Sequence, residues 1–254
     1  MYFIGIDLAW SARNNSAGAV IYAQGKSGRL VRWQERLKGN DEIISFISDN
    51  AGTSPAIVAI DAPLLVPNQT GTRPCDRQLT QEFRKYHAGT FPANRQKWET
   101  LGWQVRGEEI VRQLTTLNFS HNPYISRQAK IRRIVEVYPH PATIVLFDLA
   151  RILEYKARQG RDLEYRQKEL RKLQNLIRKL KQATPALEVD KSLFHNPNSL
   201  YGNAFKVHED FLDAILCGYI AYHAWYWGPR GYQIFGEENW KDGYILVPKL
   251  PASP

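Results

Sequence analysis

The chain has 254 residues, of which 43% are hydrophobic, and a formal net charge of +9. This hydrophobic content supports one large domain with a sizeable core and excludes an intrinsically disordered chain. The two cysteines, Cys75 and Cys217, lie far apart and outside any Cys-x-x-Cys pair. The sequence therefore excludes a disulfide framework and a cysteine-based zinc site.

The positive charge is concentrated in one segment. Residues 127–182 hold 15 basic and 6 acidic side chains, an excess equal to the net charge of the whole chain. Such an asymmetry suits a polyanionic partner, although a solvated basic helix needs no partner. We therefore expect nucleic acid as a partner, with a solvated helical face as the alternative.

The N-terminal residues and the longest apolar stretch indicate where in the cell the protein is located. A strand begins directly after Met1, which leaves no room for a signal peptide. The longest apolar stretch, "FLDAILCGYIAYHAWYWG", carries Asp213 and His223, so it predicts a buried helix rather than a membrane span. We expect a cytoplasmic protein with no membrane segment.

The first part of the chain predicts four strands and a helix. Runs at residues 2–10, 17–24 and 29–37 are separated by turn residues and predict an antiparallel meander. Residues 39–52 have the pattern of a short helix, and residues 55–67 that of a buried strand. In a mixed sheet with this order, the first strand lies beside the fourth.

The middle of the chain predicts two insertions around a fifth strand. Residues 67–126, rich in Pro, Gly, Asn, Thr and Arg, predict loops and short helices. The fifth strand, "RRIVEVYPHPA", covers 132–142. Leucine spacing then predicts an amphipathic basic helix from residue 144 to about 182, and we interpret 148–182 as a basic helical insertion.

The last part of the chain predicts a long helix at 207–228 and a short terminal hairpin. The whole chain, residues 1–254, is therefore expected to be a single α/β domain. Its core would be a mixed five-stranded sheet flanked by helices.

Three of the hydrophobic strands each carry a single carboxylate, namely Asp7, Asp61 and Glu136. The strand order makes Asp7 and Asp61 neighbours and lets Glu136 join them, while Asp210 and Asp213 share one face of the last long helix. Buried carboxylates need a compensating charge, and Mg²⁺ or Mn²⁺ prefers such oxygen ligands. A site of this kind would activate a water to attack a phosphodiester, or would hold ATP in a phosphotransferase.

Four of these five carboxylates also have a structural interpretation. Asp7 could form an ion pair with a buried arginine. Asp61 could form hydrogen bonds in the turn that follows its strand. Glu136 has arginines close by in the sequence, and Asp210 lies where a helix dipole favours negative charge.

Arginines and aromatic residues interleave in the segment 67–126. Guanidinium groups suit phosphates and aromatic rings suit unstacked bases, but the same residues would also pack an insertion against the core. They are Arg73, Arg84, Arg95 and Arg106 with Phe83, Tyr86, Phe91, Trp98 and Trp103. His140, close to the strand of Glu136, is a candidate proton shuttle.

Four motifs, "GIDLAWS", "IDAPL", "EVYPHP" and "EDFLDAILCGYIAYHA", resemble in this order the domain of unknown function 429 family. That family is regarded as predicted nucleases with a ribonuclease H-like fold. The resemblance implies a ribonuclease H-like mixed sheet here, and an Arg-then-Asp motif of the family matches "TRPCDRQL" through Arg73 and Asp76. It also implies acidic ligands for Mg²⁺ or Mn²⁺ at Asp7, Asp61, Glu136 and Asp213, with Asp210 as a helper.

The leading hypothesis is a metal-dependent nuclease that hydrolyses phosphodiester bonds of DNA or RNA. Its candidate substrate-binding residues are Arg73, Asp76, Arg84, Arg95 and His140. The opening "GIDLAWS" also resembles the first strand of actin-like sugar kinases and ATPases, so an ATP-dependent phosphotransferase is the second hypothesis. The third is a non-catalytic nucleic-acid- or protein-binding protein that keeps the carboxylates as structure.

Overall fold

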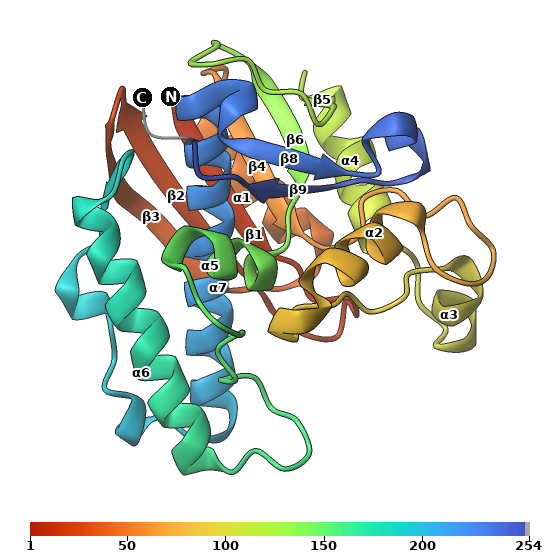
Figure 1. Ribbon diagram of the computed structural model, residues 1–254. Helices are drawn as coiled ribbons and strands as arrows, with labels where there is room; N and C mark the ends of the chain where they lie inside the picture. Colours follow the sequence, from red (N-terminus) through yellow and green to blue (C-terminus); the bar gives the residue numbers. More distant parts are fainter. Residues whose placement is uncertain (252–254) are drawn as a thin grey trace.

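A seven-stranded mixed sheet forms the centre of the computed structural model, which describes residues 1–251 (Figure 1). The strands are β1 (Tyr2–Asp7), β2 (Ser16–Gln24), β3 (Ser27–Leu37), β4 (Ala56–Asp61), β5 (Ser120–His121), β6 (Arg132–Glu136) and β7 (Ala186–Glu188). Their order in the sheet is β5-β6-β4-β1-β2-β3-β7, which places β1 in the middle. β1 is antiparallel to β2 and parallel to β4, and β4 is parallel to β6.

The five predicted strands are all present, and the first lies beside the fourth as the strand order requires. The sheet has seven strands rather than five because β5 and β7 add to its two edges. Each added strand is only two or three residues long, so it leaves no hydrophobic run in the sequence. The α/β class is confirmed.

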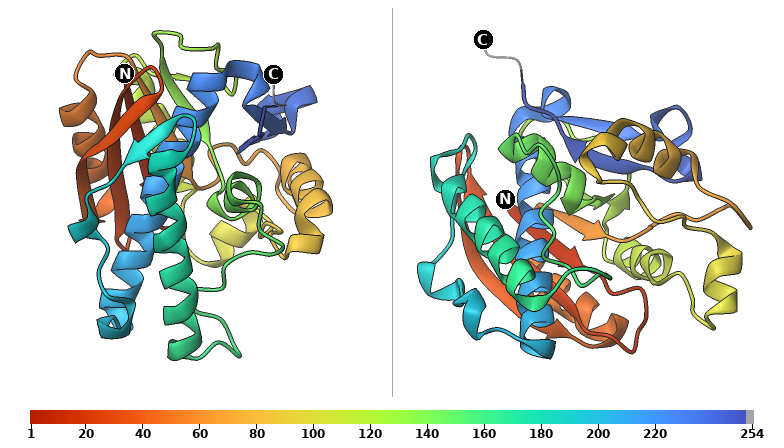
Figure 2. Two further views of the ribbon diagram at one scale, coloured as in Figure 1. Left: turned by 60° about the vertical axis from the view of Figure 1, so that its left-hand side comes forward. Right: turned by 60° about the horizontal axis from the view of Figure 1, so that its bottom comes forward.

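Helices cover both faces of the sheet. They are α1 (Gly39–Ala51), α2 (Pro74–Phe83), α3 (Arg95–Thr100), α4 (Arg106–Thr116), α5 (Pro139–Phe147), α6 (Leu163–Lys179) and α7 (Gly202–Trp227). α7 packs in the core on one face, and α1 and α4 pack on the other. α6 runs beside α7 (Figure 2).

Shorter elements complete the fold. The predicted terminal hairpin is confirmed as β8 (Tyr232–Phe235) and β9 (Ile245–Pro248), which form a separate antiparallel pair. Single-turn 3₁₀ helices cover Arg84–Tyr86, Leu180–Gln182, Lys191–Leu193, Pro197–Ser199 and Gly228–Arg230, and a longer 3₁₀ segment with a kink at Asn239 covers Glu237–Asp242. Within residues 1–251, no helix is both long and apolar enough to cross a lipid bilayer.

The prediction of one continuous helix from residue 144 is wrong. Helix α5 ends at Phe147 because Asp148 takes a left-handed conformation with φ of 51°. Helix α6 begins only after Asp162, whose side chain accepts a hydrogen bond from the Tyr165 amide at 2.8 Å. Residues 148–162 therefore form a loop, and buried Tyr155 ties this loop to the core.

A glycine lets α7 lie directly on the central strand. A Cβ atom at Gly5 would stand 2.0 Å from the carbonyl oxygen of Ala214 and 2.3 Å from the amide nitrogen of Gly218. Both are backbone atoms of a buried helix, so neither can swing aside. The close approach holds the first turns of α7, with Asp210 and Asp213, beside the end of β1.

We predict that Gly5→Ala lowers the free energy of unfolding by at least about 3 kcal/mol, because the new methyl group collides with backbone. Chemical denaturation followed by circular dichroism measures this change. The matched control is Gly89→Ala, whose Cβ would meet only atoms of the Thr80 side chain, the nearest being its methyl group at 3.1 Å. Equal stability of the two variants would contradict the role given to Gly5.

Candidate functional site

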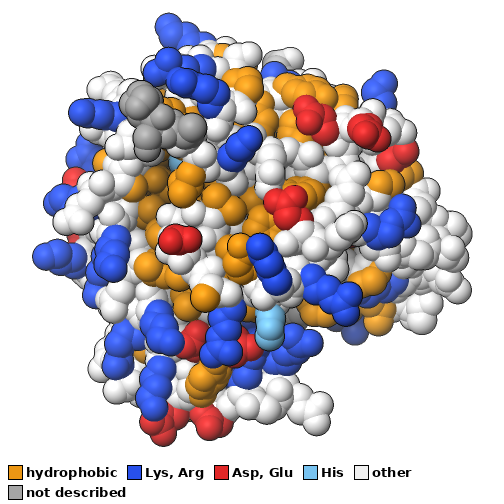
Figure 3. All heavy atoms as spheres, viewed as in Figure 1, with side chains coloured by type: hydrophobic (Ala, Val, Ile, Leu, Met, Phe, Trp, Pro, Cys, Tyr) orange, Lys and Arg blue, Asp and Glu red, His pale blue; other side chains and the backbone are white. Residues whose placement is uncertain are grey.

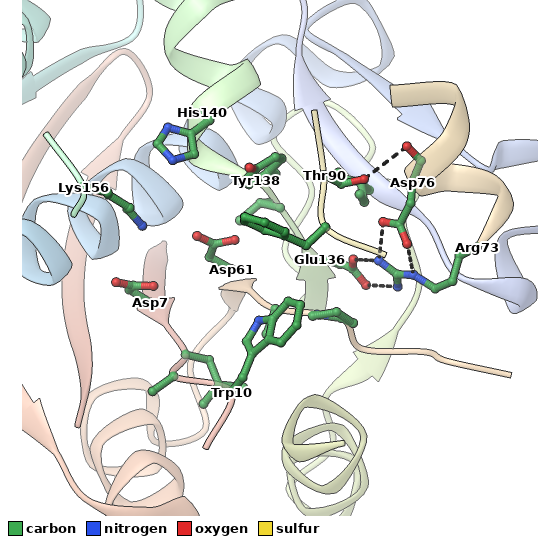
Figure 4. Close-up of a pocket in the computed structure, with 17 residues that line it drawn as sticks. Asp7, Trp10, Asp61, Arg73, Asp76, Thr90, Glu136, Tyr138, His140 and Lys156 are labelled. Carbon is green, nitrogen blue, oxygen red and sulfur yellow. Dashed lines mark hydrogen bonds and ion pairs between the residues drawn. The ribbon is translucent and has the colours of Figure 1, made fainter. Parts of the chain in front are cut away.

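Asp7 and Asp61 lie side by side at the carboxyl ends of adjacent parallel strands. They are register partners in the β1–β4 pair, so their side chains leave the same face of the sheet. Both line a cavity of about 400 Å³, which we call the aspartate cavity (Figure 4). The neighbourhood expected from the strand order is thus present.

Lys156 supplies the positive charge at this pair. Its ammonium group lies 2.7 Å from Oδ2 of Asp213, and Figure 4 shows it directed toward the space beside Asp7 and Asp61. Asp213 is fully buried on α7, and the Tyr155 hydroxyl donates a 2.6 Å hydrogen bond to its Oδ1. Three carboxylates therefore share one ammonium group.

This sharing leaves the aspartates under-compensated. Burial raises the pKa of Asp7 well above its usual range, and Lys156 opposes the rise. Burial likewise raises the pKa of Asp61, and the negative charge of Asp7 raises it further. Burial lowers the pKa of Lys156, but the carboxylates around it, Asp213 first, lift it well above the ordinary value. The ammonium therefore stays charged while the two aspartates resist ionising together.

Asp210 joins the same group from α7. It is ion-paired with Lys206, four residues earlier on the helix, and its negative charge also raises the pKa of Asp7. Burial raises the pKa of Asp210, whereas Lys206 and Asp7 lower it. Asp7 thus stands between two aspartates, Asp61 on its neighbouring strand and Asp210 on the helix.

Glu136 belongs to a different ion-pair network. Its register partner on β4 is Ile60, so its side chain leaves the sheet on the face opposite to that of Asp61. Arg73 donates to both of its oxygens, at 2.7 and 3.0 Å, and the Leu64 amide donates at 2.8 Å. Burial raises the pKa of Glu136 to about 7, and the Arg73 fork opposes that rise. Glu136 lines the aspartate cavity without joining the Asp7–Asp61 pair.

Arg73 and Asp76, the residues matched to the Arg-then-Asp motif, hold each other. Arg73 is 1% exposed and makes two 2.9 Å hydrogen bonds to Asp76 besides those to Glu136. A fifth bond runs to the carbonyl of Leu65 at 2.9 Å. All five guanidinium N–H groups are satisfied, so Arg73 fixes the walls of the aspartate cavity.

The remaining predicted substrate residues lie in three different places. His140 lines the aspartate cavity, where burial and then Lys156 lower its pKa to about 4. Arg95 lies 2.8 Å from Glu108 in an ion pair and lines a separate cavity. Arg84 is exposed at the end of α2, away from the aspartate cavity. Their roles in substrate binding stay predictions.

Sequence reasoning missed several residues that line the aspartate cavity. Lys156 lay in a segment assigned to a helix, and no spacing singled it out. Tyr138 follows the strand of Glu136 by two residues, and Trp10 lies within the "GIDLAWS" motif. Arg106 fixes the loop of Trp10 by donating to the carbonyl oxygens of Ala9 and Ser11, at 2.6 and 3.2 Å.

No group of three or more His, Cys, Asp or Glu side chains within residues 1–251 has an arrangement that would hold a metal ion as it stands. Asp7 and Asp61 are the adjacent oxygen donors, and Asp213 lies behind the Lys156 ammonium. Oδ2 of Asp213 is buried, and among the described residues the Lys156 ammonium at 2.7 Å is its one charged partner.

We predict that Asp61→Asn stabilises the protein at neutral and higher pH. Because the folded-state pKa of Asp61 lies above the ordinary 3.8, the folded protein holds a proton that the unfolded chain releases, and stability falls as pH rises above about 4. One pKa unit corresponds to about 1.4 kcal/mol, so a gain on the order of 1 kcal/mol is expected at pH 8.

Thermal unfolding in EDTA at pH 4 and pH 8 measures this effect. The variant should melt about 2–4 °C higher at pH 8 and show no advantage at pH 4. Asp49→Asn, at an exposed position on α1, is the matched control and should change neither value. A less stable Asp61→Asn protein at pH 8 would refute the prediction.

We compared the chain with curated proteins, with solved structures and with models of protein families. No curated protein and no solved structure matches the chain. One family model matches residues 5–238, a span that includes all of the carboxylates described above. The chain belongs to the family described as protein of unknown function (DUF429).

Proposed function

We propose that the protein is a divalent-metal-dependent nuclease with a ribonuclease H-like fold, which hydrolyses phosphodiester bonds of DNA or RNA. The observation that carries the proposal is the register pairing of Asp7 and Asp61, with Asp213 facing them from α7. The strand order β6-β4-β1-β2-β3 within the sheet supports the fold expected from the family resemblance.

The donor set fits a hard divalent cation. Asp7, Asp61 and Asp213 offer carboxylate oxygens, the ligands that Mg²⁺ and Mn²⁺ prefer, and the pKa values of Asp7 and Asp61 indicate that more positive charge would stabilise their ionised forms. These three residues would hold the ion once Lys156 moved aside. When bound, such an ion would lower the pKa of a water and stabilise charge that develops on the phosphate.

The protein's own side chains would perform the other steps. Lys156, 31% exposed and attached through a flexible stem, can turn from Asp213 toward a phosphate oxygen in the aspartate cavity. The ring of His140, neutral at pH 7 because of its lowered pKa, has a nitrogen that can accept a hydrogen bond from a water or from the substrate. Both residues line the cavity that Asp7 and Asp61 share.

The surface charge supports a polyanionic substrate. Lys and Arg side chains gather in the lower part of the view in Figure 3, over α6 and the 148–162 loop. The exposed members include Arg158, Lys168, Arg171, Lys172 and Arg178. A surface of this kind attracts phosphate backbones in a sequence-independent and salt-dependent way.

We predict that the purified protein cleaves at least one of single-stranded DNA, duplex DNA, RNA or branched DNA when Mn²⁺ or Mg²⁺ is present. EDTA and Asp7→Asn should each abolish cleavage, because each removes part of the metal site. Gel assays with labelled substrates measure the products, and Asp49→Asn is the matched control that should retain activity. Asp7→Asn protein that cleaves as fast as the unchanged protein would exclude the proposal.

We also predict that Lys156→Met tightens Mn²⁺ binding by roughly tenfold or more, because the variant removes a cation that competes for the same carboxylates. The increase in melting temperature with Mn²⁺ concentration measures the dissociation constant without any need for activity. Lys181→Met removes an exposed lysine that pairs with Glu188 and should leave Mn²⁺ binding unchanged. Unchanged affinity in Lys156→Met would show that the ion does not replace the ammonium.

A further inference from the structure

The aspartate cavity has aromatic walls that the metal chemistry does not require. Trp10, Phe91 and Tyr138 line it together with Asp7 and Asp61. In Figure 4, Trp10 and Tyr138 lie on either side of Asp61. The cavity's volume of about 400 Å³ falls within the range of about 300–1,000 Å³ typical of pockets for small organic groups.

Phe91 is the least buried of these aromatic residues. Its side chain is 69% exposed, although an apolar ring of this size is normally covered. The ammonium of Lys97 lies 5.8 Å from the centre of its ring and 4.6 Å from that of Trp10. The rim of the cavity thus combines ring surfaces with a positive charge, the combination that binds unpaired nucleotides.

Away from the carboxylates, Lys156 and His140, the polar groups of the cavity walls are already hydrogen-bonded within the protein. The guanidinium of Arg73 donates all of its hydrogen bonds to Glu136, Asp76 and the Leu65 carbonyl. The Thr90 hydroxyl donates to the Asp76 carbonyl at 3.2 Å. The Tyr138 hydroxyl donates to the Gly89 carbonyl at 3.3 Å. A base in this cavity would therefore be held by ring contacts rather than by hydrogen bonds to its edges.

A second cavity, which we call the polar cavity, lies on the other side of Trp10. Its volume is about 460 Å³, and it shares Asp7 and Trp10 with the aspartate cavity. Arg13 and Lys206 line it, together with Asn14, Asn15, Asn203 and Asp210, the last of which is ion-paired with Lys206. Cationic and amide side chains suit phosphates and sugars. Asp7 thus lies between the aspartate cavity, which could hold a nucleobase, and the polar cavity, which could hold the sugar-phosphate backbone.

We propose that the aspartate cavity receives one unpaired nucleobase of a single-stranded nucleic acid, whose backbone continues past Asp7 into the polar cavity. This inference rests on the proposed function and names its substrate class. A base inside a duplex cannot enter such a cavity unless it leaves its stack, so duplexes bind less well. Because the base edges are not read, discrimination between bases is weak.

The test is binding of a fluorescein-labelled dT₁₀ strand, measured by fluorescence anisotropy in EDTA and low salt so that no cleavage can occur. Phe91→Ala should weaken binding about five- to hundredfold, the usual loss for one stacking ring, and Phe91→Trp should restore it. Tyr201→Ala is the matched control, because Tyr201 is 71% exposed and lines neither cavity. Thermal melts should show that all three variants are folded.

Two further measurements separate the strand from a free nucleotide. Arg13→Ser should weaken dT₁₀ binding but leave competition by dTMP unchanged, because only the strand reaches the polar cavity. A DNA hairpin with a ten-base-pair G·C-rich stem should bind at least about tenfold more weakly than dT₁₀. The inference is overturned if Phe91→Ala binds dT₁₀ as the unchanged protein does, if the hairpin binds equally well, or if dTMP binds as tightly as dT₁₀.

The outcome is independent of cleavage. Phe91-dependent binding of dT₁₀ without cleavage of any substrate would leave this inference standing and remove the nuclease proposal. Cleavage of duplex DNA that is abolished in Asp7→Asn but unaffected in Phe91→Ala would support the nuclease proposal and exclude this inference.

Discussion

The ammonium group of Lys156 is ion-paired with Asp213 and also acts on Asp7 and Asp61, while Lys206 adds a second positive charge near Asp7. Asp7 and Asp61 are brought together by strand register, and Asp213 faces them from α7 because Gly5 lets that helix lie against β1. Neither constraint can relax without rearranging the core. The backbone therefore fixes the positions of these carboxylates. Their burial and mutual repulsion raise the pKa values of Asp7 and Asp61.

Two ion-pair systems lie within one cavity and differ in kind. Arg73 is buried, rigid and fully hydrogen-bonded, and it joins the strand end of Glu136 to the start of α2. Lys156 is a point charge on a flexible stem, carried by a loop rather than a helix or strand. A guanidinium fork fixes a geometry, whereas an ammonium can be exchanged for another cation. The Arg73 network therefore fixes the walls of the aspartate cavity, whereas the Lys156 ion pair can be replaced by another cation.

Much of the fold could be predicted from the sequence, because five of the sheet's strands are hydrophobic runs bounded by turn residues. The pairing of Asp7 with Asp61 followed from their order. The position of Glu136 did not, since a shift of one residue in the register between β6 and β4 decides which face its side chain takes. Lys156 was missed because the leucine spacing further along the segment led to the prediction of one helix from residue 144, whereas Asp148 and buried Tyr155 make residues 148–162 a loop.

The basic segment therefore has two separate effects. Its excess charge equals the net charge of the chain, and five of its lysines and arginines lie on the exposed side of α6, where they contribute a long-range electrostatic field. Lys156 belongs to the same segment but points inward, to the carboxylates. A polyanion drawn to α6 would also interact favourably with that ammonium, and any phosphate that draws Lys156 away from Asp213 increases the demand of the aspartates for another cation. Substrate and metal are thereby expected to favour each other's binding, because both act on the same lysine.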